Sequence, residues 1–140
     1  MTISRADKLG RMVSLVKLQL RLSEWQLAQL RQQERTMQDE QAWLVETLNE
    51  GKAPAGSSSD SIARRLNRTS LGARSVQERA SMQLDKVRAE IRRVKQLKEV
   101  ARVALADKLR DAEKRSLEDI AGTHAAVRDL TLRPASRNKP

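Results

Sequence analysis

Few residues of this chain of 140 could perform chemistry, and they are scattered. His124 is the only histidine, cysteine is absent, and no group of Asp, Glu and His has the spacing of a metal site. No glycine-rich phosphate loop is present. A single histidine on a helix usually has a structural or surface role. We therefore expect no catalytic residues, no metal, no cofactor and no small-molecule substrate, and we do not expect an enzyme.

Basic side chains gather in the middle of the chain. Residues 61–98 contain 11 Lys and Arg against 3 Asp and Glu, whereas residues 1–50 contain 7 of each. Clustered cations can neutralise nucleic-acid phosphates, but this segment has no aromatic residue for base stacking and no DNA-binding motif. We favour a solvated helical face, or a surface for an acidic protein, over a nucleic-acid interface. The predicted basic surface consists of Arg64, Arg65, Arg68, Arg74, Arg88, Arg92 and Arg93.

The elements that position these residues are predicted to be long helices. The chain has no Phe and no Tyr, so Trp25 and Trp43 are its only aromatic residues, and a thick globular core is disfavoured. One-third of the residues are charged and Gly and Pro are few, a composition typical of coiled coils. No apolar run approaches the roughly 20 residues of a membrane span, and no secretory signal is evident. We expect a cytoplasmic protein that reaches a membrane only through partners.

Residues 5–50 are predicted to form one helix with a heptad seam. Positions 9, 13, 16, 20, 23, 27, 30, 34, 37, 41, 44 and 48 follow 3–4 spacing, and nine of the twelve are Leu, Val or Met. Among the exceptions, Glu34 and Gln41 are expected to lower stability and to fix the register of the helix pair. The alternating stretch "LVKLQLRL" lies inside this seam, so it is read as helix despite its strand-like period.

A breaker follows at "EGKAPAGSSSDS", and a second helix is predicted beyond it. A short helix capped by Asp60 is expected at the tip over residues 51–74, with a further break at Gly72. The second long helix then spans about 75–131, because Ser75 and Glu78 make a capping box. Residues 132–140 are expected to be a flexible basic tail. The apolar positions predicted for the second helix are Ala80, Leu84, Val87, Ile91, Val94, Leu97, Ala101, Leu105, Leu109 and Ala112, then Leu117, Ile120, His124, Val127 and Leu130.

Two amphipathic helices joined in this way should pair with each other. The expected fold is all-α, a long antiparallel two-helix coiled-coil hairpin in a single domain over residues 1–135, with a short helix or loop at the tip. If Glu50 and Ser75 flank the turn, the numbers of opposing residues add up to about 125. Leu9 then lies near Ser116, and residues 117–130 extend beyond the first helix.

A second apolar stripe lies away from the predicted seam. Leu15, Leu18, Leu22 and Trp25 follow 3–4 spacing on the far side of the first helix. A partner helix on the seam cannot cover them, so they need a third helix, a second copy or another protein. The alternative is that the C-terminal segment folds back over them or that they are tolerated on the surface. Trp43 also falls off the seam, as a single residue.

The plan of helix, breaker, short tip helix, longer helix and basic tail resembles the FliJ/YscO group of type III export stalk proteins over residues 5–135. The resemblance implies association with a hexameric export ATPase and an export gate protein at the inner membrane, and handling of secretion chaperones. It places the ATPase contact at residues 5–30 and 110–135. It places the gate contact at Ile62, Leu66 and Leu71.

Three functions are therefore open. The first is a non-enzymatic stalk or adaptor of a flagellar or injectisome export apparatus. The second is a generic coiled-coil scaffold that dimerises through Leu15, Leu18, Leu22 and Trp25. The third is a basic, nucleic-acid-associated helical rod.

Overall fold

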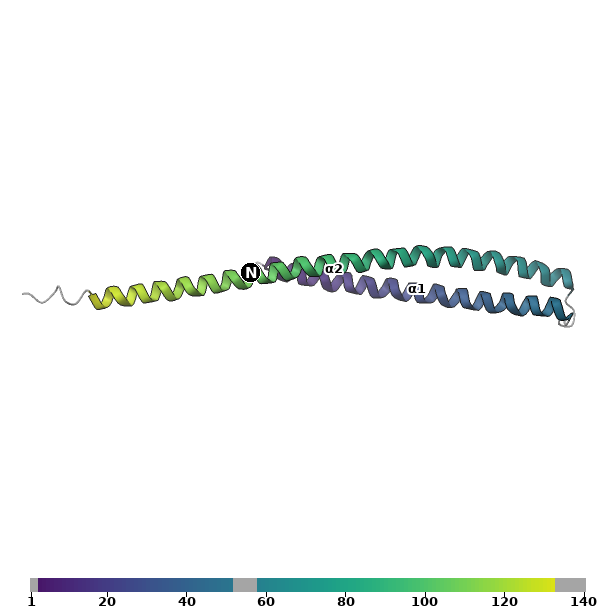
Figure 1. The fold of residues 1–140 in the computed structure, drawn as a ribbon, viewed down its shortest axis with the longest axis horizontal. Coiled ribbons are helices and arrows are strands. Elements are labelled where there is room, and N and C mark those ends of the chain that lie inside the picture. Colours follow the sequence, from purple (N-terminus) through teal and green to yellow (C-terminus); the bar gives the residue numbers. More distant parts are fainter. Residues whose placement is uncertain (1–2, 52–57, 133–140) are drawn as a thin grey trace, which may run out of the picture. The chain divides into compact units, whose positions relative to one another are not determined.

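Two long helices make up the described part of the protein. The computed structural model describes residues 3–51 and 58–132, which form α1 (Arg5–Glu50) and α2 (Ser59–Leu132) and contain no strand (Figure 1). The helices pack against each other, which confirms the predicted all-α helical hairpin. The chain divides into two units, each made from parts of both helices. Unit 1 comprises residues 1–13 and 97–140, and unit 2 comprises residues 14–96.

The core of unit 2 follows the heptad seam. All ten seam positions predicted from Val16 to Leu48 are buried or half-buried. The matching positions on α2 also follow 3–4 spacing, and they are Ile62, Leu66, Thr69, Ala73, Val76, Ala80, Gln83, Val87, Glu90 and Val94. Leu44 and Val76 are the most deeply buried side chains, each 1% exposed. The seam predicted for the first helix is therefore the face that α1 packs against α2.

The ends of α1 have simple local causes. The Ser4 hydroxyl accepts a hydrogen bond from the backbone N–H of Asp7 at 3.2 Å, which caps the first turn. At the other end, Gly51 has a φ of 65°, the left-handed conformation in which glycine commonly terminates a helix. The predicted helix over residues 5–50 has these same bounds.

The start of α2 differs from the prediction. It begins at Ser59, where a short tip helix followed by a break had been expected, and Ser75 lies inside it. The cap is provided by Ser58, whose hydroxyl accepts a hydrogen bond from the backbone N–H of Ser61 at 3.1 Å. Residues 52–57 of the predicted tip lie outside the described residues, as does the predicted tail from 133 to 140.

Gly72 does not break α2, although the sequence suggested that it would. A glycine inside a helix costs about 1 kcal/mol relative to alanine, which burial of Ala73 and Val76 beside it can offset. A β-carbon at position 72 would lie 3.4 Å from the terminal methyl group of Met37. Position 72 therefore faces Met37 of α1 within unit 2.

The register of unit 2 follows from its hydrogen bonds between helices. They join Gln41 to Ser70, Arg65 to Glu40, and Gln83 to Ser23 and Gln26. The paired residue numbers add up to 105–111, below the expected value of about 125. The difference arises because the turn lies between Glu50 and Ser59, so α2 starts closer to the turn than predicted.

Within unit 1, α2 continues beyond the N-terminal end of α1 (Figure 1). Leu97, Ala101 and Ala104 of α2 are half-buried, and Lys108 forms an ion pair with Asp7 at 3.5 Å. Leu9 had been expected near Ser116, so this pairing corrects the register of unit 1 in the same direction. Every described side chain from Asp107 to Thr131 is exposed, a longer stretch than the predicted 117–130.

Candidate functional site

One exposed apolar group lies on α1 in unit 2. Leu15, Leu18, Leu22 and Trp25, here called the α1 stripe, are 61%, 57%, 56% and 60% exposed. In unit 2, α2 packs on the opposite side of α1, where Val16 is only 6% exposed. Four apolar side chains on adjacent turns that stay exposed to this degree form a candidate protein-binding surface.

The α1 stripe has two different edges. Helical periodicity places Lys17, Arg21 and Glu24 along one edge. It places Gln19 and Gln26 along the other, where Gln26 accepts a hydrogen bond from Gln83 of α2 at 3.3 Å. One edge is thus charged, with a net charge of +1, and the other is neutral.

The predicted tip residues do not form one surface. Ile62 is 6% exposed and belongs to the core, Leu66 is half-buried, and Leu71 is 56% exposed. The seam continues into the tip because α2 begins at Ser59, and this places Ile62 and Leu66 between the helices. Leu71 is the one exposed residue of the three, and Leu66 is accessible in part.

Trp43 is engaged within unit 2. The Arg65 guanidinium carbon lies 5.9 Å from the centre of the Trp43 ring, a cation–π distance. Arg65 also donates a hydrogen bond from Nε to a Glu40 carboxylate oxygen at 2.9 Å, and its terminal nitrogen forms an ion pair with the same oxygen at 2.8 Å. Trp43 therefore has a contact across the helices within unit 2, and its side chain remains 48% exposed.

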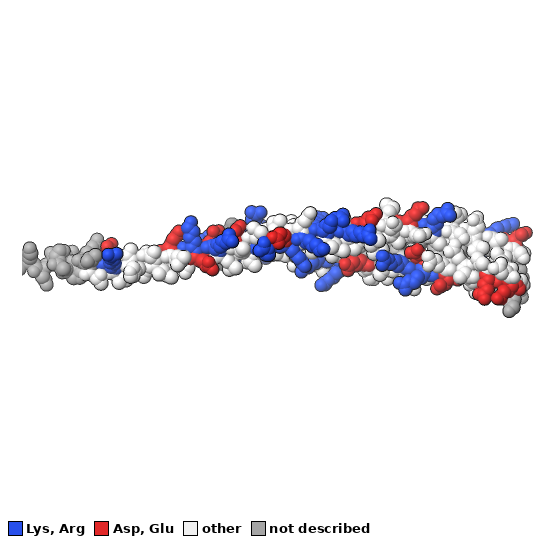
Figure 2. Space-filling model, in the orientation of Figure 1, with Lys and Arg blue, Asp and Glu red and all other residues white. Residues whose placement is uncertain are grey.

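The seven predicted basic residues are all exposed. Counted from the seam, Arg68, Arg74 and Arg92 fall at outer positions of the heptad, on the side of α2 away from α1. Arg88 also approaches Asp85 at 4.0 Å. Figure 2 shows blue and red side chains intermixed along α2, so the basic groups form no continuous single-sign groove on that face.

A second exposed apolar group lies on α2 in unit 1, and the sequence located it only in part. Its members, here called the α2 terminal face, are 51–67% exposed: Leu105, Leu109, Leu117, Ile120, Val127 and Leu130. Leu105 and Leu109 had been assigned to the seam, but Ala104 is half-buried in place of Leu105. The sequence feature that indicates this exposure is the spacing of apolar residues, which follow one another every four residues from Leu97 to Leu109. This spacing turns successive apolar residues away from α1.

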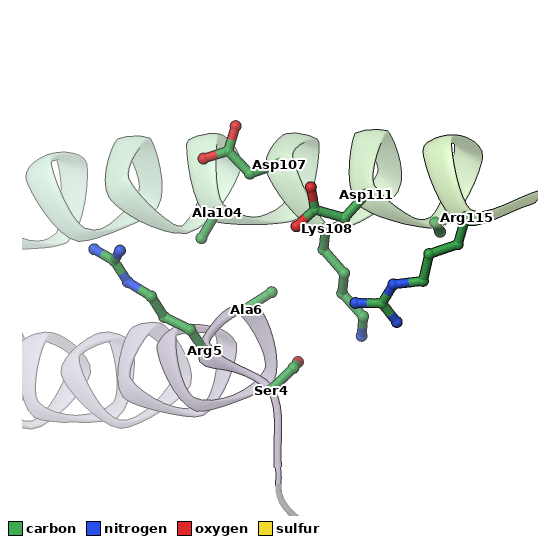
Figure 3. A pocket seen from close by; sticks show the side chains of 9 residues that line it. Ser4, Arg5, Ala6, Ala104, Asp107, Lys108, Asp111 and Arg115 are labelled. Atoms are coloured by element: carbon green, nitrogen blue, oxygen red, sulfur yellow. The ribbon is translucent and has the colours of Figure 1, made fainter. Parts of the chain in front are cut away.

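A shallow hollow lies where the first turn of α1 meets α2 in unit 1 (Figure 3). It is lined by Ser4, Arg5, Ala6, Ala104, Asp107, Lys108, Asp111, Ala112 and Arg115. The Ser4 hydroxyl, and next the Lys108 ammonium, lower the pKa of the Asp7 carboxyl beside it. These charges are of both signs. The hollow lies at the junction of the two helices in unit 1.

No metal centre or membrane span occurs among residues 3–51 and 58–132. In that part of the chain, no three His, Asp or Glu side chains are placed to hold a metal ion. Neither described helix has a stretch long and apolar enough to cross a membrane. The α1 stripe and the α2 terminal face are candidate functional surfaces because their apolar side chains are at least 51% exposed.

Comparison with known proteins gives no further assignment. No protein-family model, no curated protein and no solved structure matches this chain significantly.

Proposed function

We propose that this chain is a non-enzymatic coiled-coil stalk or adaptor of a type III protein export apparatus. In this role it engages the hexameric export ATPase and an export gate protein, in the cytoplasm and at the inner membrane only through these partners. The observation that carries the proposal is the α2 terminal face, where a helix continues beyond α1 with apolar side chains at least 51% exposed. Such a helix gains stability when another protein covers it.

The two apolar groups suit an adaptor because they are separate surfaces. The α2 terminal face belongs to the end of the chain that the family resemblance assigns to the ATPase. The gate contact is harder to support at its predicted position, because Ile62 is in the core and only Leu71 is exposed there. The α1 stripe is the better supported surface for a second partner.

Direct binding to a purified export ATPase hexamer and to the soluble domain of a gate protein tests the proposal. We expect Ile120→Gln with Val127→Gln to weaken ATPase binding at least about tenfold, since apolar anchors dominate such contacts. The matched control is Met82→Gln, which changes a side chain of unit 2 that is 72% exposed. Absence of binding, or equal effects of the two variants, would contradict the assignment.

A generic coiled-coil scaffold is the second candidate, favoured by the exposure of the α1 stripe alone. It predicts self-association without any export component. Sedimentation of the Leu18→Gln, Trp25→Gln double variant distinguishes the two candidates. If the chain is a scaffold that dimerises through the α1 stripe, this variant must be monomeric.

A further inference from the structure

The α2 terminal face is long enough to pair with a second helix. From Leu105 to Leu130 it extends about 39 Å at 1.5 Å per residue. Residues 120–127, "IAGTHAAV", contain no Lys, Arg, Asp or Glu. They form part of the white stretch toward the C-terminal end of α2 in Figure 2. An amphipathic helix with no cover on its apolar side is only marginally stable in water.

The spacing of this face suits a nearly straight helix pair. Seven positions recur every 11 residues in steps of four, three and four, and they are 105, 109, 112, 116, 120, 123 and 127. They include four of the six members of the α2 terminal face, while Leu117 and Leu130 lie outside this series. An 11-residue period lacks the left-handed supercoil of heptads. An antiparallel pair of these positions has its centre near residue 118. If an antiparallel second copy shares that centre, Ile120 meets Ser116 of the copy, and Leu109 meets Val127 of the copy.

The charges of the segment also fit a second copy. From Leu109 to Leu130 there are 4 basic and 5 acidic residues, although the whole chain carries +10. Arg115 and Asp119 lie on the same edge of the apolar face. In the antiparallel pair, Arg115 faces Asp119 of the copy, and Asp119 faces Arg115 of the copy. Unit 2 already contains a pair of this geometry on the edge of its seam, between Glu40 and Arg65.

The α1 stripe lacks this self-complementarity. Centred antiparallel pairing of the stripe would oppose Leu15 with Trp25 and Leu18 with Leu22. On the charged edge, this pairing would place Arg21 of each copy opposite Lys17 of the other copy. Like charges directly opposed on a helix edge weaken association. The two apolar surfaces are therefore not equivalent as dimer interfaces.

We propose that two copies of this chain pair antiparallel through residues 105–130 of α2, with Arg115 and Asp119 forming reciprocal ion pairs. This pairing does not depend on the export role. It covers the same face that the ATPase would contact, so the dimer and the ATPase complex are alternative states of that face. The α1 stripe takes no part in this pairing.

Sedimentation equilibrium of the full chain and of two charge variants tests the pairing. Arg115→Asp and Asp119→Arg each replace both ion pairs by like-charge contacts in a homodimer. We expect each variant alone to raise the dimer dissociation constant roughly tenfold, because two ion pairs at the edge of the interface become like-charge contacts. An equimolar mixture of the two variants should recover wild-type affinity, because each chain then meets opposite charges. Reciprocal contacts between positions 115 and 119 of different chains predict this recovery.

Two further variants control for folding and for specificity. Ile120→Gln should also weaken the dimer by about tenfold or more, without loss of the circular dichroism signal of the paired helices. Leu18→Gln on the α1 stripe should leave the dissociation constant unchanged. A monomeric wild-type chain at high concentration, a mixture no tighter than its components, or a dimer lost through Leu18→Gln alone would each overturn the proposal.

Discussion

Polar side chains within the seam are the most informative residues of unit 2. Gln41 donates a hydrogen bond to Ser70 at 2.8 Å, and Gln83 donates to the backbone carbonyl of Ser23 at 3.0 Å. Each of these two hydrogen bonds forms at one register of the helix pair. If one helix slid along the other, the partly buried side-chain amide of the glutamine would lose its partner. These contacts give a physical basis for the predicted role of Gln41 in register.

Glu90 is the seam residue whose environment costs stability. One of its carboxylate oxygens is buried and has no hydrogen-bond partner among the described residues, and Val87 and Val94 on adjacent turns are buried. We expect Glu90→Leu to raise the free energy of unfolding by about 1–2 kcal/mol, since it removes an unsatisfied acceptor and adds apolar burial. Urea unfolding measures the change. The control Glu78→Leu, at an exposed position, should have little effect, and a destabilised Glu90→Leu would contradict the argument.

Asp7 connects protonation to the stability of the start of α1. Its pKa lies below the ordinary value of 3.8, mainly through the Ser4 hydroxyl and secondarily through Lys108. A lowered pKa stabilises the folded state above pH 3.8, and this stabilisation is lost as the pH falls through the folded-state value. We expect Ser4→Ala to raise the Asp7 pKa in an NMR titration more than Lys108→Ala does. Lys114→Ala should leave it unchanged, and a larger effect of Lys108→Ala would reverse the assigned causes.

At the scale of the elements, the sequence predicted α1 well and α2 less well. Each α1 seam position is Leu, Val, Met or a polar exception at the correct spacing, so period alone determines its buried face. The start of α2 was missed because Gly72 was read as a break. A glycine inside a helix costs about 1 kcal/mol relative to alanine, and the packing of α2 against α1 outweighs this cost. The local sequence around Gly72 gives no information about that packing. The register depends in turn on where the turn begins, so the same error moved it. Leu105 and Leu109 are exposed for a different reason, the repeated four-residue step from Leu97 to Leu109.

The contrast between the two faces of α1 gives an element-scale prediction. Leu44 is 1% exposed and Leu18 is 57% exposed, although both are leucines within the same helix. We expect Leu44→Ala to lower the free energy of unfolding by about 2–5 kcal/mol, through lost burial and a cavity between the helices. Leu18→Ala should change it by less than about 0.5 kcal/mol in dilute solution. Thermal unfolding followed by circular dichroism compares the two, and equal losses would mean that Leu18 also belongs to the core.

At the scale of the whole molecule, stability should be uneven along α2. Residues 62–94 pack against α1 within unit 2, whereas every described side chain from Asp107 to Thr131 is exposed. A helix without packing opens locally at low free-energy cost, so its amides exchange with solvent sooner. We therefore expect hydrogen exchange, measured by mass spectrometry in dilute solution, to be fast over 109–131 and slow over 62–94.

The dependence of hydrogen-exchange protection on protein concentration shows whether the C-terminal part of α2 is isolated or paired with a second copy. If two copies cover the α2 terminal face, protection over 105–131 must rise with concentration, because association is linked to local stability by mass action. Protection over 62–94 should stay constant, since its contacts lie within one chain. The Arg115→Asp variant provides the control, and its C-terminal segment should need a higher concentration to gain the same protection. Strong protection of 109–131 at high dilution would show that the chain stabilises this helix by itself.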